Sequence, residues 1–582
     1  MRTLVPALSV LMVLASLVSS PRGEAADAAA PGVQLQDYWV FHQSNAASPT
    51  LLQKAIALMK EAKGLGYNGF LLADSKLEKF QLQDKGYVRN WRKFRQACTE
   101  EGMKLIVPVC SIGYMAEFMA GDPNLAEGMP VRGAEFVVRQ GQLVPSDTTA
   151  RLVNGPLTEW KGDVPRGWWA DRPGRVSFRD DRITFGGRPT LRQEHGRGQG
   201  GPVRLSQRIA VKPWQSYHLS VMARTEGCTS TDFRVMALSG GPDQDRVLDW
   251  QPPAIRETMD WTRIDVTFDS LDNREVTIYC GSWGVKKGTI WWSDVRIEPA
   301  GWTNVIRRAS LPLSVTSDDG KTVFTEGKDF SEVKDPLLGH DPNPGYFTNA
   351  HAAPVVAVPA GSRLREGQKV LAGYHFAMSV GKPGQMNACL SEPAVYEHAD
   401  AIARFVGENI QPDVFMMGYD EVRHCGWDDS CANRHLTCGQ ILAENVRRVS
   451  EIVRRHANGR PIATWSDMFD PFHLARKDGI MYLAKGEGPW YGSWEGLPAD
   501  VLILNWRQNN ADSLKFFADR GQPQILAGYY DADPARIVGW LKMAAGLKGV
   551  RGVMYTTWNQ DYSKLGAFLK YAKQFEADPK AK

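Results

Sequence analysis

The chain has 582 residues, of which 43% are hydrophobic and 23% charged, as is ordinary for a globular protein of two or more domains. Its 69 basic and 65 acidic residues leave a net charge of only +4, and no run of lysine and arginine forms a stripe for nucleic acid. The composition therefore argues against a nucleic-acid partner. It leaves the oligomeric state open.

The first residues have the layout of a secretory signal peptide. Arg2 precedes an apolar run from Leu4 to Val18, and small residues follow near Gly23 to Ala25. We therefore predict a signal peptide over residues 1–26 and a secreted or periplasmic mature protein. No later segment offers the ~20 apolar residues that a membrane span requires, so no membrane association is expected after cleavage.

Residues 33–122 alternate between strand and helix patterns. Apolar runs predict strands at Tyr38–His42, Gly69–Asp74 and Lys104–Val109, and helical periodicity predicts helices at Pro49–Ala62 and Val88–Glu101. This alternation is typical of parallel β/α units. We interpret the segment as the first part of a barrel.

Residues 123–364 lose the helical period and predict an all-β insertion. Short alternating segments, rich in Trp, Tyr, Thr and Val, are separated by turn residues. The part at about 150–300 resembles carbohydrate-binding modules with a jelly-roll, galactose-binding-like fold. The residues that carry this resemblance are Asn154-Gly155, Ser206–Val211 and Gly288–Val295. The resemblance implies glycan binding and admits a structural calcium ion. By composition alone, its tryptophans are more often sandwich core than ligand platforms.

Residues 365–578 return to the alternating pattern and predict the second part of the barrel. Strands are expected from Val414 and at Pro461–Trp465, Val501–Asn505, Gln524–Gly528 and Gly552–Thr557. With the first three strands the total is eight, provided that a strand at Lys369–His375 belongs to the insertion. The predicted fold class is therefore α/β: a (β/α)8 TIM-type barrel interrupted after strand 3 by an all-β jelly-roll domain.

One strand ends in two adjacent acids, Asp420 and Glu421, and parallel α/β barrels bind substrates at the carboxyl ends of their strands. Carboxylates and flat aromatic faces suit a carbohydrate, and glycosidic-bond cleavage is the chemistry that needs only carboxylates. No phosphate loop and no metal-ligand set accompanies the strand ends, so no catalytic cofactor or metal is assigned. The other candidate residues at strand ends are His42, Asp74, Arg423, Trp465, Asp467, Trp506, Tyr529, Tyr530 and Trp558.

The run Gly418-Tyr419-Asp420-Glu421-Val422 resembles the Gly-Gly-Asp-Glu-Val motif of glycoside hydrolase family 20, the β-N-acetylhexosaminidases. The resemblance implies a substrate-assisted, retaining hydrolase of β-linked N-acetylhexosamine glycans. Glu421 would be the general acid/base, and Asp420 would orient the substrate's 2-acetamido group. Tyr530 or Tyr529 would bind that group, and Trp465, Trp506 and Trp558 would wall its pocket. Two departures are Tyr419 in place of glycine and Trp558-Asn559-Gln560 in place of Trp-Gly-Glu.

Other interpretations stay open on the sequence alone. Asp420 could cap the next segment while Glu421 pairs with Arg423, and the acid at Asp467 could belong to a turn. His42 and Asp74 could be satisfied core residues. An enzyme with a protein nucleophile, Asp467 or Glu495, and a non-catalytic glycan-binding protein are the alternative functions.

Eight cysteines permit disulfides without specifying them. Cys425, Cys431 and Cys438 lie close together in the sequence beside the acidic pair. Their spacing matches no two-residue zinc-ligand pair, so a disulfide or free buried thiols are favoured over a metal.

Overall fold

The computed structural model describes residues 34–196, 201–229, 233–240, 246–251, 256–282, 285–348, 351–381 and 385–577. The predicted signal peptide, residues 1–26, lies outside them. Eight parallel strands close into a barrel, with each strand paired to the next along the chain and the last to the first. They are β1 (Asp37–Gln43), β2 (Gly69–Ala73), β3 (Lys104–Val109), β21 (Val414–Met417), β23 (Ile462–Trp465), β25 (Leu502–Asn505), β26 (Gln524–Leu526) and β27 (Val550–Tyr555).

Side chains alternate between the inside and the outside of the barrel. On β1, Trp39 and Phe41 belong to the cluster that fills the barrel, whereas Tyr38 and Val40 pack outward against the helices. This two-residue period follows from strand geometry. The helices around the barrel are α1 (Pro49–Leu65), α2 (Lys85–Glu100), α3 (Pro393–Asn409), α5 (Cys438–Ala457), α6 (Ala511–Asp519), α7 (Arg536–Ala544) and α8 (Leu565–Ala577).

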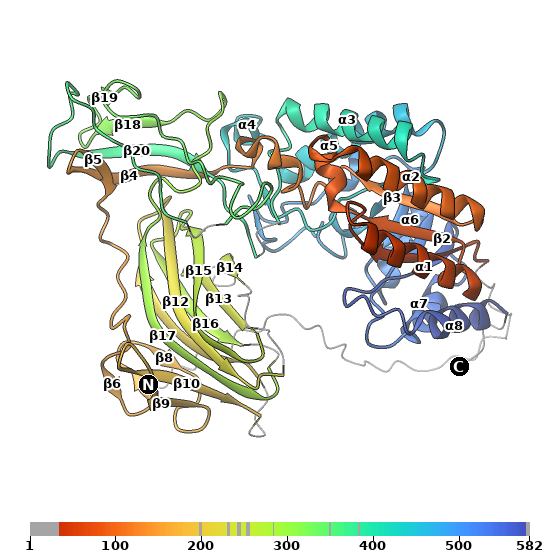
Figure 1. Ribbon diagram of the computed structural model, residues 1–582, viewed down its shortest axis with the longest axis horizontal. Helices are drawn as coiled ribbons and strands as arrows, with labels where there is room; N and C mark the ends of the chain where they lie inside the picture. The colour runs from red at the N-terminus through yellow and green to blue at the C-terminus, as the bar shows by residue number, and fades with distance from the viewer. Residues whose placement is uncertain are drawn as a thin grey trace.

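Between β3 and β21 the described chain builds three five-stranded antiparallel sheets, which lie to one side of the barrel (Figure 1). The first contains β4 (Met129–Arg139), β5 (Gln142–Pro145), β18 (Ser314–Ser317), β19 (Val323–Phe324) and β20 (Lys369–Phe376). The second contains β9 (Ser177–Phe185), β10 (Arg188–His195), β12 (Ser216–Glu226), β15 (Met259–Asp269) and β17 (Gly288–Pro299). The third contains β8 (Trp169–Ala170), β11 (Val203–Ala210), β13 (Phe233–Ser239), β14 (Val247–Gln251) and β16 (Glu275–Ser282).

The strand predicted at Lys369–His375 is β20, and it pairs with β4 rather than with a barrel strand. The expected boundary at residue 365 is therefore too early, because this strand still belongs to the inserted sheets. Trp291 and Trp292 of the second sheet are buried, with Trp292 at 0% exposure, whereas Trp261 is partly exposed. Trp169 is different, since half of its surface is exposed.

Among the described residues, no helix combines the length and the apolar character needed to cross a bilayer.

Candidate active site

The two adjacent acids reach the same side of the barrel because the chain leaves strand geometry before them. β21 ends at Met417, and Glu421 has a left-handed backbone with φ of +49°. That conformation is uncommon for a residue with a side chain and marks local strain. Gly113, in the loop after β3, lies so close that an added Cβ would stand 1.5 Å from the Asp420 carbonyl oxygen. Only glycine fits there.

The Glu421 carboxylate is held by donors from four segments. Its Oε2 accepts hydrogen bonds from Tyr114 (2.8 Å), Gln385 (2.7 Å) and Arg423 (3.2 Å), and its Oε1 accepts one from Tyr482 (3.3 Å). Its side chain nevertheless remains 37% exposed. The charge of Arg423 and these hydrogen bonds lower the pKa of Glu421 despite burial. The group is an ionised carboxylate that solvent, or a substrate, can reach.

Asp420 and Asp467 have the opposite character. Burial and the neighbouring charge of Glu421 raise the pKa of Asp420 to about 7. Burial, together with the charges of Asp420 and Glu421, raises the pKa of Asp467 well above its usual value. The Oδ1 of Asp467 is buried and has no hydrogen-bond partner among the described residues. Three neighbouring carboxyl groups therefore divide into one anion and two proton-holding acids.

A row of aromatic rings lies at the carboxyl ends of the barrel strands, the end that also carries these acids. Trp506 lies edge-on to Trp465 at 5.8 Å between ring centroids and contacts Trp558 at 5.6 Å, and Phe41 contacts both Trp465 and Trp558. Trp465 is buried, whereas Trp558 is 44% exposed. Trp558 is held in place by Asp531, which accepts hydrogen bonds from its backbone and from Thr557. This side of the barrel offers a flat apolar face to a ligand.

Arg423 joins Glu421 to the inserted part of the chain. It is buried, donates to the Val380 carbonyl (2.9 Å) and to Glu421, and stacks over the Tyr482 ring at 4.9 Å. The ion pair considered in the sequence analysis is thus present. It lies within a network that leaves Glu421 accessible, rather than closing it off.

Two predicted rim residues serve the structure instead. Asp74 accepts hydrogen bonds from the backbone of Ala46 and Lys76 and from the Tyr87 hydroxyl, and it caps the 3-10 helix that follows β2. His42 faces outward on β1, where its Nδ1 lies 2.6 Å from the Tyr562 hydroxyl. Burial lowers the pKa of His42 to about 4, so the ring is neutral. We therefore do not retain either residue as a substrate contact.

Tyr530 also lies away from the acids. It is fully buried, stacked on Tyr555 and packed against Phe568 of α8, because it faces the helix layer rather than the barrel interior. Tyr530 is therefore not placed to bind the substrate's acetamido group, the role that the resemblance implied. Tyr529, its neighbour, is partly exposed near Asp531 and remains a candidate contact.

Tyr419, the departure from the glycine-rich motif, has a structural explanation. Its ring is fully buried against Phe469, and its hydroxyl donates to Asn445 of α5. The side chain therefore ties the acidic loop to a helix and does not occupy the site. Glu495, one of the alternative nucleophiles, lies on the surface beside Arg520 and is excluded from the cluster.

Sequence reasoning missed three donors to Glu421: Tyr114, Gln385 and Tyr482. None follows a predicted strand directly: Tyr114 lies in the loop after β3, Gln385 lies between β20 and α3, and Tyr482 directly precedes the short strand β24 (Leu483–Ala484). One signal was available for Tyr114, since it comes directly after Gly113 in the loop that follows a barrel strand. Tyr482 has a positive φ of +51°, which no sequence pattern reports for a tyrosine.

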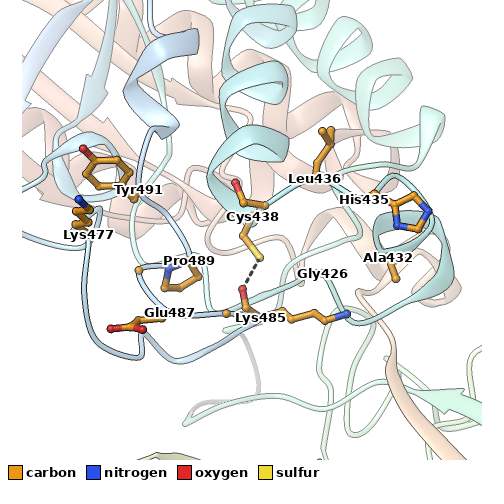
Figure 2. Close-up of a pocket in the computed structure, with 13 residues that line it drawn as sticks. Gly426, Ala432, His435, Leu436, Cys438, Lys477, Lys485, Glu487, Pro489 and Tyr491 are labelled. Carbon is orange, nitrogen blue, oxygen red and sulfur yellow. Dashed lines mark hydrogen bonds between the residues drawn. The ribbon is translucent and has the colours of Figure 1, made fainter.

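A separate pocket of about 440 Å³ lies beyond the acidic loop (Figure 2). Gly426 and Cys438 form part of its wall, Lys477 and Lys485 add positive charge, and the Cys438 thiol contacts the Lys485 carbonyl. None of the three site carboxyl groups lines it. This pocket is therefore distinct from the acid cluster.

Comparisons with known proteins add only general likenesses. No family model and no curated protein matches the chain. Solved structures that resemble parts of it include a CBM4 module, with 18% identity over 26% of this chain and 99% of that chain at a TM-score of 0.21. The CBM22-1 xylan-binding domain from Paenibacillus barcinonensis Xyn10C has 13% identity over 26% of this chain and 93% of that chain, at a TM-score of 0.19.

A rhamnosidase from Novosphingobium sp. PP1Y has 10% identity over 91% of this chain and 55% of that chain, at a TM-score of 0.26. The structural neighbours thus include carbohydrate-binding modules and a glycosidase. At these TM-scores the likenesses carry no argument about function, which has to come from the site.

Proposed function

We propose that the chain is a glycoside hydrolase whose acid–base centre consists of Asp420 and Glu421, with Asp467 beside them. The observation that carries this proposal is a pair of adjacent carboxyl groups in different surroundings at the carboxyl end of a closed barrel: four donors hold Glu421, whereas Asp420 lies beside that anion. Glycosidic cleavage requires one carboxylic acid that gives a proton to the leaving oxygen and one carboxylate that acts on the sugar. The aromatic face beside the acids supports a carbohydrate ligand.

We assign the proton to Asp420 and the negative charge to Glu421. Four donors stabilise the anionic form of Glu421, whereas burial beside that anion keeps Asp420 protonated up to about pH 7. The family resemblance implied the reverse roles. Asp467 keeps its proton as well, which avoids a third negative charge at the same place.

The finer proposal concerns the substrate and the mechanism. We propose a β-linked N-acetylhexosamine glycan and substrate-assisted retention, with Glu421 accepting a hydrogen bond from the acetamido N–H and Asp420 protonating the leaving oxygen. This assignment rests on the motif around Gly418, with the roles set by the charge states. The predicted signal peptide would place the activity outside the cytoplasm.

A hydrolysis screen tests the function. The full chain and the Glu421→Gln variant are incubated with aryl β-glycosides, including N-acetylglucosaminide, N-acetylgalactosaminide, glucoside and galactoside. We expect release from at least one substrate by the wild type and a loss of at least about 10²-fold in the variant. Preference for the acetamido sugars supports the finer proposal. Equal rates without the acetamido group would exclude substrate assistance.

Binding without turnover is the outcome that would replace this proposal. If the wild type binds glycans from a library but hydrolyses none, the chain is a glycan-binding protein. Circular dichroism of wild type and variant shows that any loss of activity does not reflect unfolding.

A further inference from the structure

A second cluster of side chains, made of two carboxyl groups and two thiols, is fully enclosed by the protein. Glu127, Cys389, Asp428 and Cys431 are each at most 2% exposed, and one ligand atom from each lies within 4.8 Å of the other three. The residues come from three separate segments: the loop after β3, the segment before α3, and the short helix α4 (Asp429–Ala432) with the residue before it. All eight cysteines are free thiols in the structure.

Three of the six separations between the ligand atoms match the edges of a metal coordination shell, and all six are within 4.8 Å. The Cys389 and Cys431 sulfurs lie 3.3 Å apart, Cys389 Sγ lies 3.3 Å from Asp428 Oδ1, and Cys431 Sγ lies 3.4 Å from Glu127 Oε2. Tetrahedral zinc has bonds of about 2.0–2.3 Å, so its ligand atoms are roughly 3.3–3.8 Å apart.

The carboxylates are oriented by their second oxygens. Glu127 Oε1 accepts from the Trp427 backbone at 3.0 Å, which leaves Oε2 directed at Cys431. Asp428 Oδ2 accepts from Arg308 and from the Gly128 backbone, while Oδ1 accepts from the Cys431 backbone at 3.0 Å and faces Cys389. Protein metal sites use outer hydrogen bonds of this kind to aim their ligands.

Only one of the two carboxyl groups in the cluster has a positively charged partner among the described residues. Arg308 is the cation paired with Asp428, and it also pairs with Glu392 at 3.1 Å. Glu127 has no ion pair among the described residues. Buried charges are costly unless they are paired or coordinate a metal. A divalent cation would give Glu127 the positively charged partner that the described residues do not supply.

We propose that Glu127, Cys389, Asp428 and Cys431 form a structural zinc site. Two thiolates favour zinc over hard cations such as Mg²⁺ and Ca²⁺, and four protein ligands leave no open coordination position, as in structural rather than catalytic sites. This inference does not depend on the proposed hydrolysis.

The zinc site would hold the acidic loop in place through a short segment, residues 385–389, which we call the strap. Gln385 bonds to Glu421, Asn387 exchanges two hydrogen bonds with His424, and Cys389 contacts Asp428. The strap therefore runs alongside the acidic loop from the active site to the cysteines. Zinc at one end positions Gln385 and Glu421 at the other.

The test is the metal content of the full-length protein. Wild type, Cys389→Ser, Cys431→Ser and Cys98→Ser are incubated with Zn²⁺ alone, desalted and measured by mass spectrometry of the metal. Cys98 is a matched control, because it is an equally buried free cysteine in α2. We expect stoichiometric zinc in wild type and Cys98→Ser and its loss in the other two variants.

Cobalt substitution of the wild type keeps the test decisive if a variant fails to fold. Co²⁺ bound by two thiolates gives a thiolate-to-cobalt charge-transfer band in the near ultraviolet. Absence of that band together with absence of retained zinc overturns the proposal. A Cys389–Cys431 disulfide found by peptide mapping of the non-reduced protein overturns it as well.

Discussion

The candidate active site and the enclosed cluster share one stretch of chain, because Asp420, Glu421, Asp428 and Cys431 lie within twelve residues. Their environments differ. In the cluster at Asp420 and Glu421, the Glu421 carboxylate is partly exposed and is surrounded by neutral donors and one arginine. At Asp428 and Cys431 the groups are sealed from solvent and directed at one another. The difference separates a site that exchanges its ligand from a site that keeps it.

The comparison also shows how one chain segment serves both purposes. The acidic loop is strained at Glu421, and strain of this kind persists only where surrounding structure holds it. The strap and the enclosed cluster supply that support. The open cluster can then present an accessible carboxylate in a fixed position.

The largest expected effect at the open cluster comes from removing its proton donor. Asp420→Asn keeps the size and polarity of the side chain but cannot protonate a leaving group. We expect kcat/KM for the best aryl glycoside to fall by about 10² to 10⁴-fold at pH 6. An unchanged rate would show that Asp420 is not the acid. An aryl substrate with a better leaving group should recover part of the loss.

The next effect concerns the exposed ring of Trp558. Trp558→Ala removes a stacking face, so we expect KM to rise by about 10-fold with a smaller change in kcat. Trp169→Ala is the matched control, because Trp169 is also half exposed but lies in the inserted sheets. If both variants behave alike with a small substrate, Trp558 is not part of the site.

A smaller effect is predicted for Asp467, which distinguishes it from Asp420. Because Asp467 already holds a proton, Asp467→Asn should leave kcat/KM within about 3-fold of wild type. Because the pKa of Asp467 is higher in the folded than in the unfolded state, the wild type has its full stability below the unfolded-state pKa. It loses stability as pH rises through the folded-state pKa. The variant should therefore unfold at a higher temperature than wild type at pH 8. Loss of all activity would instead favour Asp467 as a nucleophile.

The smallest effect on catalysis is expected at Asp74. Asp74→Ala removes a helix cap and leaves its donors without an acceptor, which costs about 1–2 kcal/mol of unfolding free energy. Denaturant unfolding measures that loss, while kcat/KM should stay at the wild-type value. A large fall in kcat with an intact fold would return Asp74 to the site.

The barrel could be predicted from the sequence because its strands are short apolar runs between helical periods. The helix predicted at Pro49–Ala62 is α1, which runs from Pro49 to Leu65, and the strand at Val414 ends before the acids as expected. Within the insertion, β10 is hard to recognise as a strand in the sequence because most of its residues are polar.

Two donors to Glu421, namely Gln385 and Tyr482, and the enclosed cluster could not be predicted. Cys389 and Glu127 lie roughly 40 and 300 residues from Asp428, and only the return of the chain from the inserted sheets brings them together. The cysteine spacing near Cys431 argued against zinc, because two of the four ligands come from outside that segment. His42 and Asp74 were placed at the rim by position alone, which cannot tell a substrate ligand from a cap or an outward-facing ring.

The division of charge between Asp420 and Glu421 is tested most directly by the pH dependence of kcat/KM in the free enzyme. Asp420 holds its proton below its raised pKa of about 7 and loses it above, while Glu421, with a lowered pKa, stays ionised across that range. The wild type should therefore lose activity as pH rises through about 7, and Asp420→Asn should lack this decline. A wild-type profile that stays flat well above pH 7, or an unchanged decline in Asp420→Asn, would contradict the assignment.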